Sequence, residues 1–328
     1  MEKLLLEGLF FAIGLAFLYY GAEWLVRGSA AVALRHGIRP LVVGLTVVAM
    51  GTSLPEFVVN FLAAFQNTPE LALGNIIGSN IANIGLILGA AALVAPFRID
   101  ARTLRKEYPI MMAAMLAFSF MGIDGVIGFW DGILLFSGFI AFILFLVRDA
   151  QKNPYKTNIA DIPEVRKEDV QAPGWKRGIL IAGGIVALTG GARLMVSSAV
   201  SIAELFGVNP IIIGLTIVAI GTSLPELATS VVGAVRGEGD LSLGNVLGSN
   251  LFNVLFVIGG VALIKPLPVS TEAVYLHFPV MLAFGILVFP LAEFGKKLGR
   301  FEGATLLTAF FVYMGYLIYI ASMSRSPL

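Results

Sequence analysis

Cysteine is absent from this 328-residue chain, and histidine occurs only at His36 and His277. The lack of cysteine excludes disulfides, thiol redox chemistry and cysteine-based metal sites, and two histidines are too few for a histidine-rich metal site. Charge is also scarce, because only 13% of the residues are charged, against about a quarter in a soluble domain. The net charge of +1 points to no particular partner, and we expect no nucleic-acid partner. The composition predicts an integral membrane protein whose surroundings are the lipid bilayer.

Long apolar segments fall into two groups of five, separated by a charged stretch. They lie near residues 8–25, 39–64, 71–95, 108–122 and 127–147, and then near 177–196, 209–234, 241–264, 273–292 and 302–321. A helix needs about 20 residues to cross the hydrocarbon. We therefore expect an all-α protein with ten transmembrane helices, in which residues 1–147 and 177–328 form two five-helix units joined by a linker at 148–176.

The two units repeat the same motifs. GTSLPE at 51–56 returns at 221–226, and GNIIGSNIAN at 74–83 returns as GNVLGSNLFN at 244–253, always 170 residues later. Repeats of this kind indicate a duplicated structural unit. Because each unit has an odd number of crossings, the second copy should enter the membrane inverted relative to the first.

Basic residues gather on one side of the expected membrane. When loops are assigned alternately to two faces, all of the 22 lysines and arginines fall on one face except Lys3, Arg193, Lys265 and Arg325. The face rich in positive charge is the cytoplasmic one. We therefore expect a cell-membrane protein with both termini extracellular and with its central linker in the cytoplasm.

The GTSLPE motifs bring oxygen atoms together at membrane depth. Thr52 and Glu56 are four residues apart and share one helix face, as do Thr222 and Glu226 in the copy. Pro55 breaks the helical hydrogen bonding before it and frees a backbone carbonyl. A carboxylate at membrane depth is expensive and marks a functional site. Carboxylates, hydroxyls and carbonyls suit hard cations such as Ca²⁺ or Na⁺.

The second motif adds neutral oxygens. Ser79 and Asn83 are four residues apart, as are Ser249 and Asn253. The glycines of GNxxGSN also form small-xxx-small patterns, which are typical of close helix packing, and this interpretation stays open beside the functional one.

GTSLPE followed by GNxxGSNxxN, duplicated over essentially the whole chain, resembles the cation/calcium exchanger superfamily and most closely its prokaryotic sodium/calcium exchangers. The resemblance implies a ten-helix antiporter whose main cation ligands are Glu56 and Glu226, and whose first and sixth helices slide over the rest. The remaining site positions that it implies are Ala49, Thr52, Ser53, Ala219, Thr222 and Ser223 for Na⁺, with Ser79, Asn83, Ser249 and Asn253 completing the site. Several relatives have Asp at the position of Asn253, so this site carries two carboxylates where theirs carries three.

The expected function is exchange of Ca²⁺ for Na⁺ through one shared site by alternating access, with exchange of Ca²⁺ for H⁺ on the same glutamates as the alternative. We expect no enzyme activity, since the chain has no HExxH pair, no cysteine nucleophile and no aspartate pair at membrane depth. A channel is disfavoured because the duplication lies within one chain, whereas channels surround a pore with symmetric subunits. No cofactor is expected beyond the transported ions, and a single chain should suffice for function.

Overall fold

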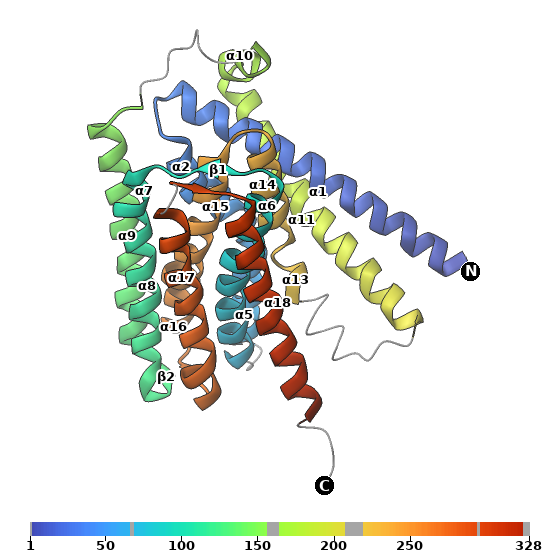
Figure 1. The fold of residues 1–328 in the computed structure, drawn as a ribbon, viewed down its shortest axis with the longest axis vertical. Coiled ribbons are helices and arrows are strands. Elements are labelled where there is room, and N and C mark those ends of the chain that lie inside the picture. The colour runs from blue at the N-terminus through green and yellow to red at the C-terminus, as the bar shows by residue number, and fades with distance from the viewer. Residues whose placement is uncertain (1, 66–68, 156–163, 207–218, 294–295, 324–328) are drawn as a thin grey trace.

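A computed structural model describes residues 2–65, 69–155, 164–206, 219–293 and 296–323. Figure 1 shows these residues as a bundle of long helices, with the pair α1 and α11 crossing it obliquely. The first half contains α1 (Glu2–Arg35), α2 (Pro40–Val43), η1 (Gly44–Val48), α3 (Ala49–Thr52), α4 (Leu54–Phe65), α5 (Pro69–Ala82), η2 (Asn83–Leu88), α6 (Gly89–Val94), α7 (Ala101–Arg105), α8 (Glu107–Met121), η3 (Gly122–Asp124) and α9 (Phe129–Lys152).

The second half follows a short linker helix, α10 (Glu164–Gln171). It contains α11 (Gly174–Leu205), α13 (Ala219–Gly221), α14 (Leu224–Val235), α15 (Gly239–Leu251), η6 (Phe252–Ile258), α16 (Gly259–Ala262), η7 (Ala273–His277), α17 (Phe278–Glu293) and α18 (Arg300–Met323). The elements η1, η2, η6 and η7 are π-helical stretches, and η3 is a 3₁₀ turn.

Within the described residues, seven continuous helical spans are long and apolar enough to cross a membrane, and some of them combine consecutive elements, as α5, η2 and α6 do. A further pair of helices, Pro40–Thr52 and Leu54–Ala63, is apolar enough to count as an eighth span if it is taken as one helix with a 48° bend. The expected segment at 108–122 corresponds to α8, which has only 15 residues. The segment at 209–234 falls partly outside the described residues, and its described part is α13 and α14. The fold is therefore an all-helical membrane fold, and the count of ten crossings remains a prediction.

The bend lies where the sequence placed a proline. Ser53 separates α3 from α4 with φ −87° and ψ 8°, outside helical geometry. Pro55 follows two residues later and has no N–H to continue the hydrogen-bond ladder of α3. Ser223 takes the same conformation before α14, with φ −93° and ψ 7°, and Pro225 follows it. Each GTSLPE motif thus ends one helix and starts another.

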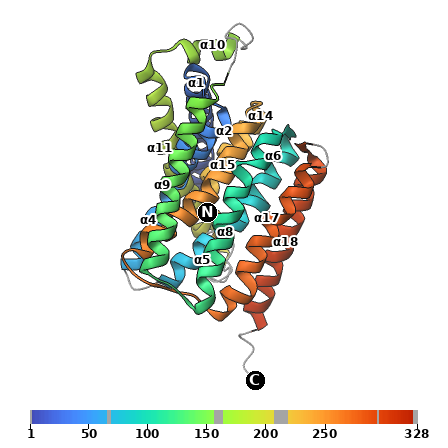
Figure 2. The ribbon, with the colours of Figure 1, turned by 90° about the vertical axis from the view of Figure 1, so that its left-hand side faces the viewer.

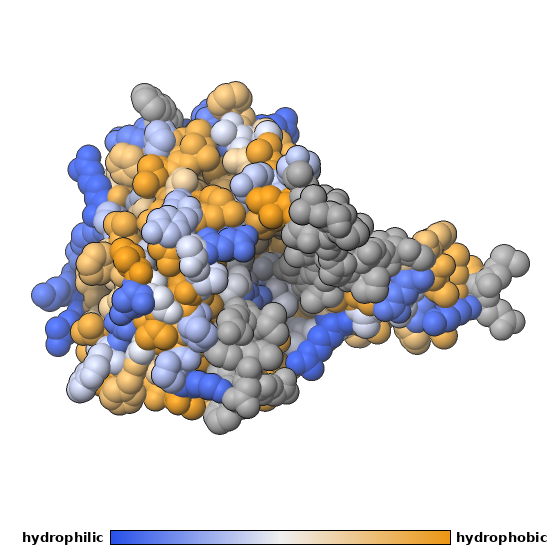
Figure 3. All heavy atoms as spheres, turned by 90° about the horizontal axis from the view of Figure 1, so that it is seen from below, coloured by the Kyte–Doolittle hydropathy of each residue, from blue (hydrophilic) through white to orange (hydrophobic). Residues whose placement is uncertain are grey.

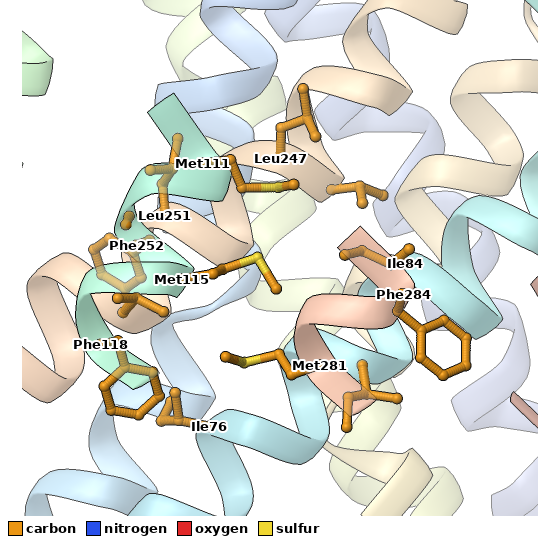
Figure 4. Packing of buried hydrophobic residues seen from close by; sticks show 14 of the residues in the cluster. Ile76, Ile84, Met111, Met115, Phe118, Leu247, Leu251, Phe252, Met281 and Phe284 are labelled. Atoms are coloured by element: carbon orange, nitrogen blue, oxygen red, sulfur yellow. The ribbon is translucent and has the colours of Figure 1, made fainter. Parts of the chain in front are cut away.

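The centre of the molecule is formed by the two segments that carry the second motif. The spans Ala72–Val94 and Gly239–Ala262 are 83% and 94% buried, whereas the other five spans are buried by 28% or less. Their apolar residues share one core with α8 and α17, which includes Ile76, Met111, Met115, Phe252 and Met281 (Figure 4). The four predicted site residues of the second motif, Ser79, Asn83, Ser249 and Asn253, therefore lie on the best-packed spans of the fold.

Helices α1 and α11 form a separate pair beside this core. Figure 1 shows them running together at an angle to α17 and α18, and Figure 2 shows them, seen from the side, on the flank opposite α18. A Cβ added to Gly14 would lie 2.8 Å from the carbonyl oxygen of Gly191, and one added to Gly184 would lie 2.8 Å from that of Gly21. Glycine is needed at both crossings because the backbones touch.

Two short antiparallel ribbons join loops that are distant in sequence. Strand β1 (Phe97–Arg98) pairs with β4 (Lys297–Leu298), and β2 (Val126–Ile127) pairs with β3 (Leu267–Pro268). In Figure 1, β1 and β2 lie at opposite ends of the bundle. Figure 3 looks onto the end that carries β2, where hydrophilic residues lie among apolar ones.

Candidate cation-binding site

The GTSLPE motif of the first half meets both motifs of the second half. Ser53 Oγ donates to Glu226 Oε1 at 2.9 Å and lies 3.0 Å from Ser249 Oγ. Thr52 Oγ1 lies 3.2 Å from Asn245 Oδ1. Residues separated by more than 170 positions thus form one buried polar centre.

Two carboxylates occupy this centre without a basic partner. Glu56 and Glu226 are each only 1% exposed, and their carboxylates lie close enough to repel one another when both are ionised. Among the residues that the structure describes, neither forms a salt bridge. One oxygen of each carboxylate, Oε2, is buried without a hydrogen-bond partner. A buried carboxylate in this situation is strongly destabilising unless a cation or a proton neutralises it.

Neutral oxygens at other predicted site positions are also buried and unpaired. The amide oxygens of Asn83 and Asn253 are buried without a partner, as is the hydroxyl of Ser223. Each asparagine uses its NH₂ group instead, since Asn83 Nδ2 donates to Asn250 Oδ1 at 3.0 Å and Asn253 Nδ2 donates to Asn80 Oδ1 at 3.3 Å. The unpaired groups are therefore all oxygens, which are the ligands that Ca²⁺ and Na⁺ require.

π-Helical geometry occurs where these asparagines stand. Asn83 begins η2, and Asn253 is the second residue of η6. A π-turn widens the helix locally, and such turns are frequent at functional sites. Within the described part of the chain, no group of three or more acidic or histidine side chains could hold a metal ion. A cation bound at the predicted positions would therefore have two carboxylates together with amide and hydroxyl oxygens as its ligands.

A second layer of amides supports the helices that follow each break. Asn60 Nδ2 donates to the carbonyl oxygen of Glu56 at 2.7 Å, and Asn75 Nδ2 donates to Asn60 Oδ1 at 3.2 Å. In the copy, Asn245 Nδ2 lies 3.0 Å from Ser230 Oγ and 3.4 Å from the carbonyl oxygen of Glu226. These contacts fix the backbone that carries each glutamate.

The other predicted residues lie as follows. Ser79 and Ser249 are buried, and Thr222 is half-buried. Ala49 is buried, and its carbonyl oxygen accepts a hydrogen bond from the backbone N–H of Ser53 at 3.0 Å. Ala219 begins α13, but its side chain lies outside the described part of the structure.

The packing interpretation of the small-xxx-small pattern is confirmed in the second half but not in the first, where a Cβ on Gly74 or Gly78 would meet nothing within 4 Å. A Cβ on Gly244 would lie 2.4 Å from the carbonyl oxygen of Leu41, and one on Gly248 would lie 2.6 Å from that of Leu45. These glycines let α15 approach α2 and η1 closely, which brings the two halves of the centre together.

The sequence analysis did not predict Asn80 and Asn250, or the two methionines whose sulfur atoms contact their amide groups, Met281 and Met111. The four-residue spacing selected Ser79 and Asn83 but not Asn80, which directly follows Ser79. A signal was present, because all four missed residues recur 170 positions apart.

Comparison with known proteins places this geometry among cation transporters. The sequence model of the family described as "Sodium/calcium exchanger protein" matches residues 7–148 and 177–319. The inner membrane protein YrbG of Escherichia coli (strain K12) is 35% identical over 94% of this chain and 96% of its own length. The sodium/calcium exchanger MaX1 of Methanosarcina acetivorans is 30% identical over 94% of this chain and 97% of its own length.

A solved structure of the sodium-calcium exchanger NCX_Mj, soaked with Na⁺ and Ca²⁺, is 31% identical to this chain. It superposes with a TM-score of 0.78 and covers 98% of this chain and 99% of its own. The likeness therefore extends over both groups of helices and over both pairs of motifs.

Proposed function

Because the chain belongs to the sodium/calcium exchanger protein family, we propose that it exchanges Ca²⁺ for Na⁺ at the buried centre that contains Glu56 and Glu226. The family is one of membrane transporters, so the protein is a multi-pass Ca²⁺-exchanging antiporter and not an enzyme. The choice of Na⁺ as the coupling ion and the assignment of the ligands are the parts that we add.

The unpaired buried oxygens carry this proposal. Both glutamates are buried and retain an oxygen with no partner, and two asparagine amides and one serine hydroxyl are in the same situation. Ca²⁺ takes six to eight oxygen ligands, and these groups with nearby backbone carbonyls can supply that number. The two carboxylates balance the charge of one Ca²⁺, which offsets the cost of burying them.

Two buried like charges also favour exchange over uniport. At an effective dielectric constant of about 20, two unit charges a few ångströms apart repel by several kcal/mol. When the site is empty, its two charged and desolvated carboxylates should prevent it from changing access from one side of the membrane to the other. Cations that neutralise the carboxylates should remove this barrier. The coupling ion therefore has to occupy the same carboxylates that release Ca²⁺.

The hydroxyls around the carboxylates favour Na⁺ over H⁺ as this ion. Ser53 contacts both Glu226 and Ser249, and Thr52 lies on the same face as Glu56. Such neutral oxygens are ligands for Na⁺, whereas a proton needs only the carboxylate itself. Our assignment gives Na⁺ the oxygens at Ala49, Thr52, Ser53, Ala219, Thr222 and Ser223, and has Ser79, Asn83, Ser249 and Asn253 complete the Ca²⁺ site.

We also assign the two halves, 1–147 and 177–328, as inverted five-helix repeats joined by a cytoplasmic linker. Equivalent ribbons support this assignment, because β1 and β3 are 170 residues apart and their ribbons lie at opposite ends of the bundle (Figure 1). The distribution of basic residues supports extracellular termini. One chain supplies every proposed ligand, so a single chain should transport.

Purified protein in proteoliposomes tests the coupling. We expect Ca²⁺ uptake when an outward Na⁺ gradient is imposed, and little uptake when only a pH gradient of equal size is imposed. Choline in place of Na⁺ is the control for the osmotic and membrane-potential effects of the gradient. Uptake driven by the pH gradient alone would support Ca²⁺/H⁺ exchange and contradict the Na⁺ assignment.

A further inference from the structure

Four buried asparagines link the two halves of the site through their side chains. Asn83 donates to Asn250, and Asn253 donates to Asn80, so the two bonds are equivalent under the 170-residue offset. All four side chains are at most 1% exposed. In each bond the residue proposed as a ligand gives its NH₂ group and keeps its Oδ1 unpaired.

The supporting asparagines contact a methionine sulfur at their other end. Asn80 Nδ2 lies 3.7 Å from Met281 Sδ, and Asn250 Nδ2 lies 3.6 Å from Met111 Sδ. These contacts are again 170 residues apart. A thioether sulfur can accept a hydrogen bond but cannot donate one, so it can face only the NH₂ end of an amide.

This chemistry determines, for each asparagine in the series of contacts, which way the side-chain oxygen and the NH₂ group point. The two ends of a carboxamide have nearly the same shape, and their orientation follows from the hydrogen bonds that they make. Met281 orients the Nδ2 of Asn80 toward itself, which turns Asn80 Oδ1 toward Asn253. Asn253 must then offer its NH₂ group to Asn80, and its Oδ1 remains for a cation.

We propose that Met281 and Met111 are positioning residues that hold the amide oxygens of Asn253 and Asn83 toward the transported cation. The inference rests on the proposed function, in which these two asparagines are ligands. If an amide turned around, it would present an NH₂ group to the cation, which repels it.

The competing explanation is that both methionines only fill the core. Figure 4 shows Met111, Met115 and Met281 together in that core. Met115 lies one helical turn after Met111 on α8 and is equally buried, at 0% exposed. Among the described contacts, it bonds no asparagine, so it is a matched control for a methionine that only packs.

The first test compares three leucine variants. Leucine keeps most of the volume of methionine but has no acceptor. We expect Met111→Leu and Met281→Leu each to raise the Ca²⁺ KM and the binding Kd roughly threefold to tenfold, which corresponds to the loss of one modest hydrogen bond, with kcat little changed. Met115→Leu should leave both constants within about twofold of wild type, because it removes no hydrogen bond. Equal effects of all three substitutions would overturn the proposal.

The second test is a double-mutant cycle, which separates direct coupling from general loosening of the core. If Met281 acts through Asn253, Met281→Leu should have almost no further effect on Kd in an Asn253→Ala background. Met111→Leu should keep its full effect in that background and lose it in Asn83→Ala. The two cycles are independent, so either can decide if one alanine variant does not fold.

Isothermal titration of purified protein with Ca²⁺ measures these constants, and melting curves check folding. Additive effects of Met281→Leu and Asn253→Ala would overturn the positioning role while leaving the transport function intact. A wild-type protein that binds no Ca²⁺ would overturn the proposed function, and the positioning role with it.

Discussion

At the scale of single residues, the candidate site combines two buried carboxylates with neutral oxygen atoms that have no hydrogen-bond partner. Glu56 and Glu226 have no basic neighbour among the described residues, and each keeps one oxygen unpaired. Hydrogen bonds from Ser53 and the asparagine pairs set the orientation of the remaining groups. Under the proposed function, this arrangement leaves the charge of each glutamate available to a cation.

Removing either charge should therefore abolish Ca²⁺ transport. We expect Glu56→Gln and Glu226→Gln each to lose uptake below detection, because one of two charges facing a divalent cation contributes several kcal/mol of attraction in a desolvated site. Radioactive Ca²⁺ uptake into proteoliposomes measures the loss, and size-exclusion profiles check folding. Glu293→Gln, at an exposed carboxylate on the end of α17, is the control and should transport normally. If either site variant kept near-normal flux, that residue would not be a ligand.

Substitution of Asn253 by aspartate adds a negative charge to the site instead of removing one. In Asn253→Asp the side chain can no longer donate to Asn80 Oδ1, and a third acid joins the two glutamates. Like charges disfavour one another, so the new carboxylate should bind either a proton or an extra monovalent cation.

We expect the wild type to run on Na⁺ without K⁺, and transport by Asn253→Asp to depend more strongly on pH or on K⁺. Ca²⁺ uptake over about pH 6 to 8, with and without K⁺, measures both dependences. A wild type that already requires K⁺ would contradict the two-carboxylate site.

At the scale of elements, α1 and α11 differ from the rest of the bundle. They touch backbone to backbone at Gly14 and Gly191 and at Gly21 and Gly184. Charged groups tie the other end of α1 to its surroundings, since Arg27 donates to Asp169 of α10 at 2.8 and 2.9 Å and Arg236 bonds Glu23 at 2.5 Å. The pair also packs against the core in its middle, where its buried apolar residues cluster with Val48 and Leu241.

The glycine contact can be tested with adjacent residues. A Cβ on Gly191 would meet the carbonyl oxygen of Gly14 at 2.8 Å, whereas one on Gly190 would meet nothing within 4 Å. Gly191→Ala should lower stability by about 1–3 kcal/mol, since the helices must separate. Gly190→Ala should be neutral or slightly stabilising, since alanine is the better helix former. Melting temperatures in detergent measure both effects, and equal values for the two variants would mean that the contact is not tight in solution.

The sequence predicted most elements but underestimated the length of these two helices. Apolar windows at 8–25 and 177–196 became Glu2–Arg35 and Gly174–Leu205. The first window ended just before Arg27 because charge lowers the hydropathy, yet Arg27 forms ion pairs with Glu23 and Asp169 and stays helical. Partners such as Asp169 and Arg236 become visible only when the chain is folded. The motif spacing likewise predicted Asn83 and Asn253 as site residues but not Met111 and Met281, which contact Asn250 and Asn80 from other helices.

At the scale of the whole molecule, the two ribbons hold pairs of loops together at opposite ends of the bundle. The loop at Arg98 pairs with that at Lys297, and the loop at Val126 pairs with that at Pro268. The sequence analysis assigned successive loops alternately to the two faces of the membrane. That assignment puts the two loops of each ribbon on the same face. Basic residues concentrate in the first of these loop pairs, which we therefore assign to the cytoplasm.

Cysteine labelling tests this orientation without background, because the chain contains no cysteine. Thr271 and Arg105 are both exposed and lie near opposite ribbons. We expect Thr271→Cys to react with an impermeant maleimide on intact cells, and Arg105→Cys to react only after the membrane is opened. The reverse pattern would mean that the termini are cytoplasmic.

The length of α1 has a consequence for the lipid around the protein. Its 34 residues extend about 51 Å at 1.5 Å per residue, whereas the hydrocarbon core is about 30 Å thick. Such a helix must tilt or project, and the balance between the two depends on bilayer thickness. Because α11 is bound to α1 along its glycines, a thicker or thinner bilayer would turn both helices together. The rate of Ca²⁺ exchange in vesicles of increasing acyl-chain length should therefore pass through an optimum, whereas a transporter of upright helices would respond far less.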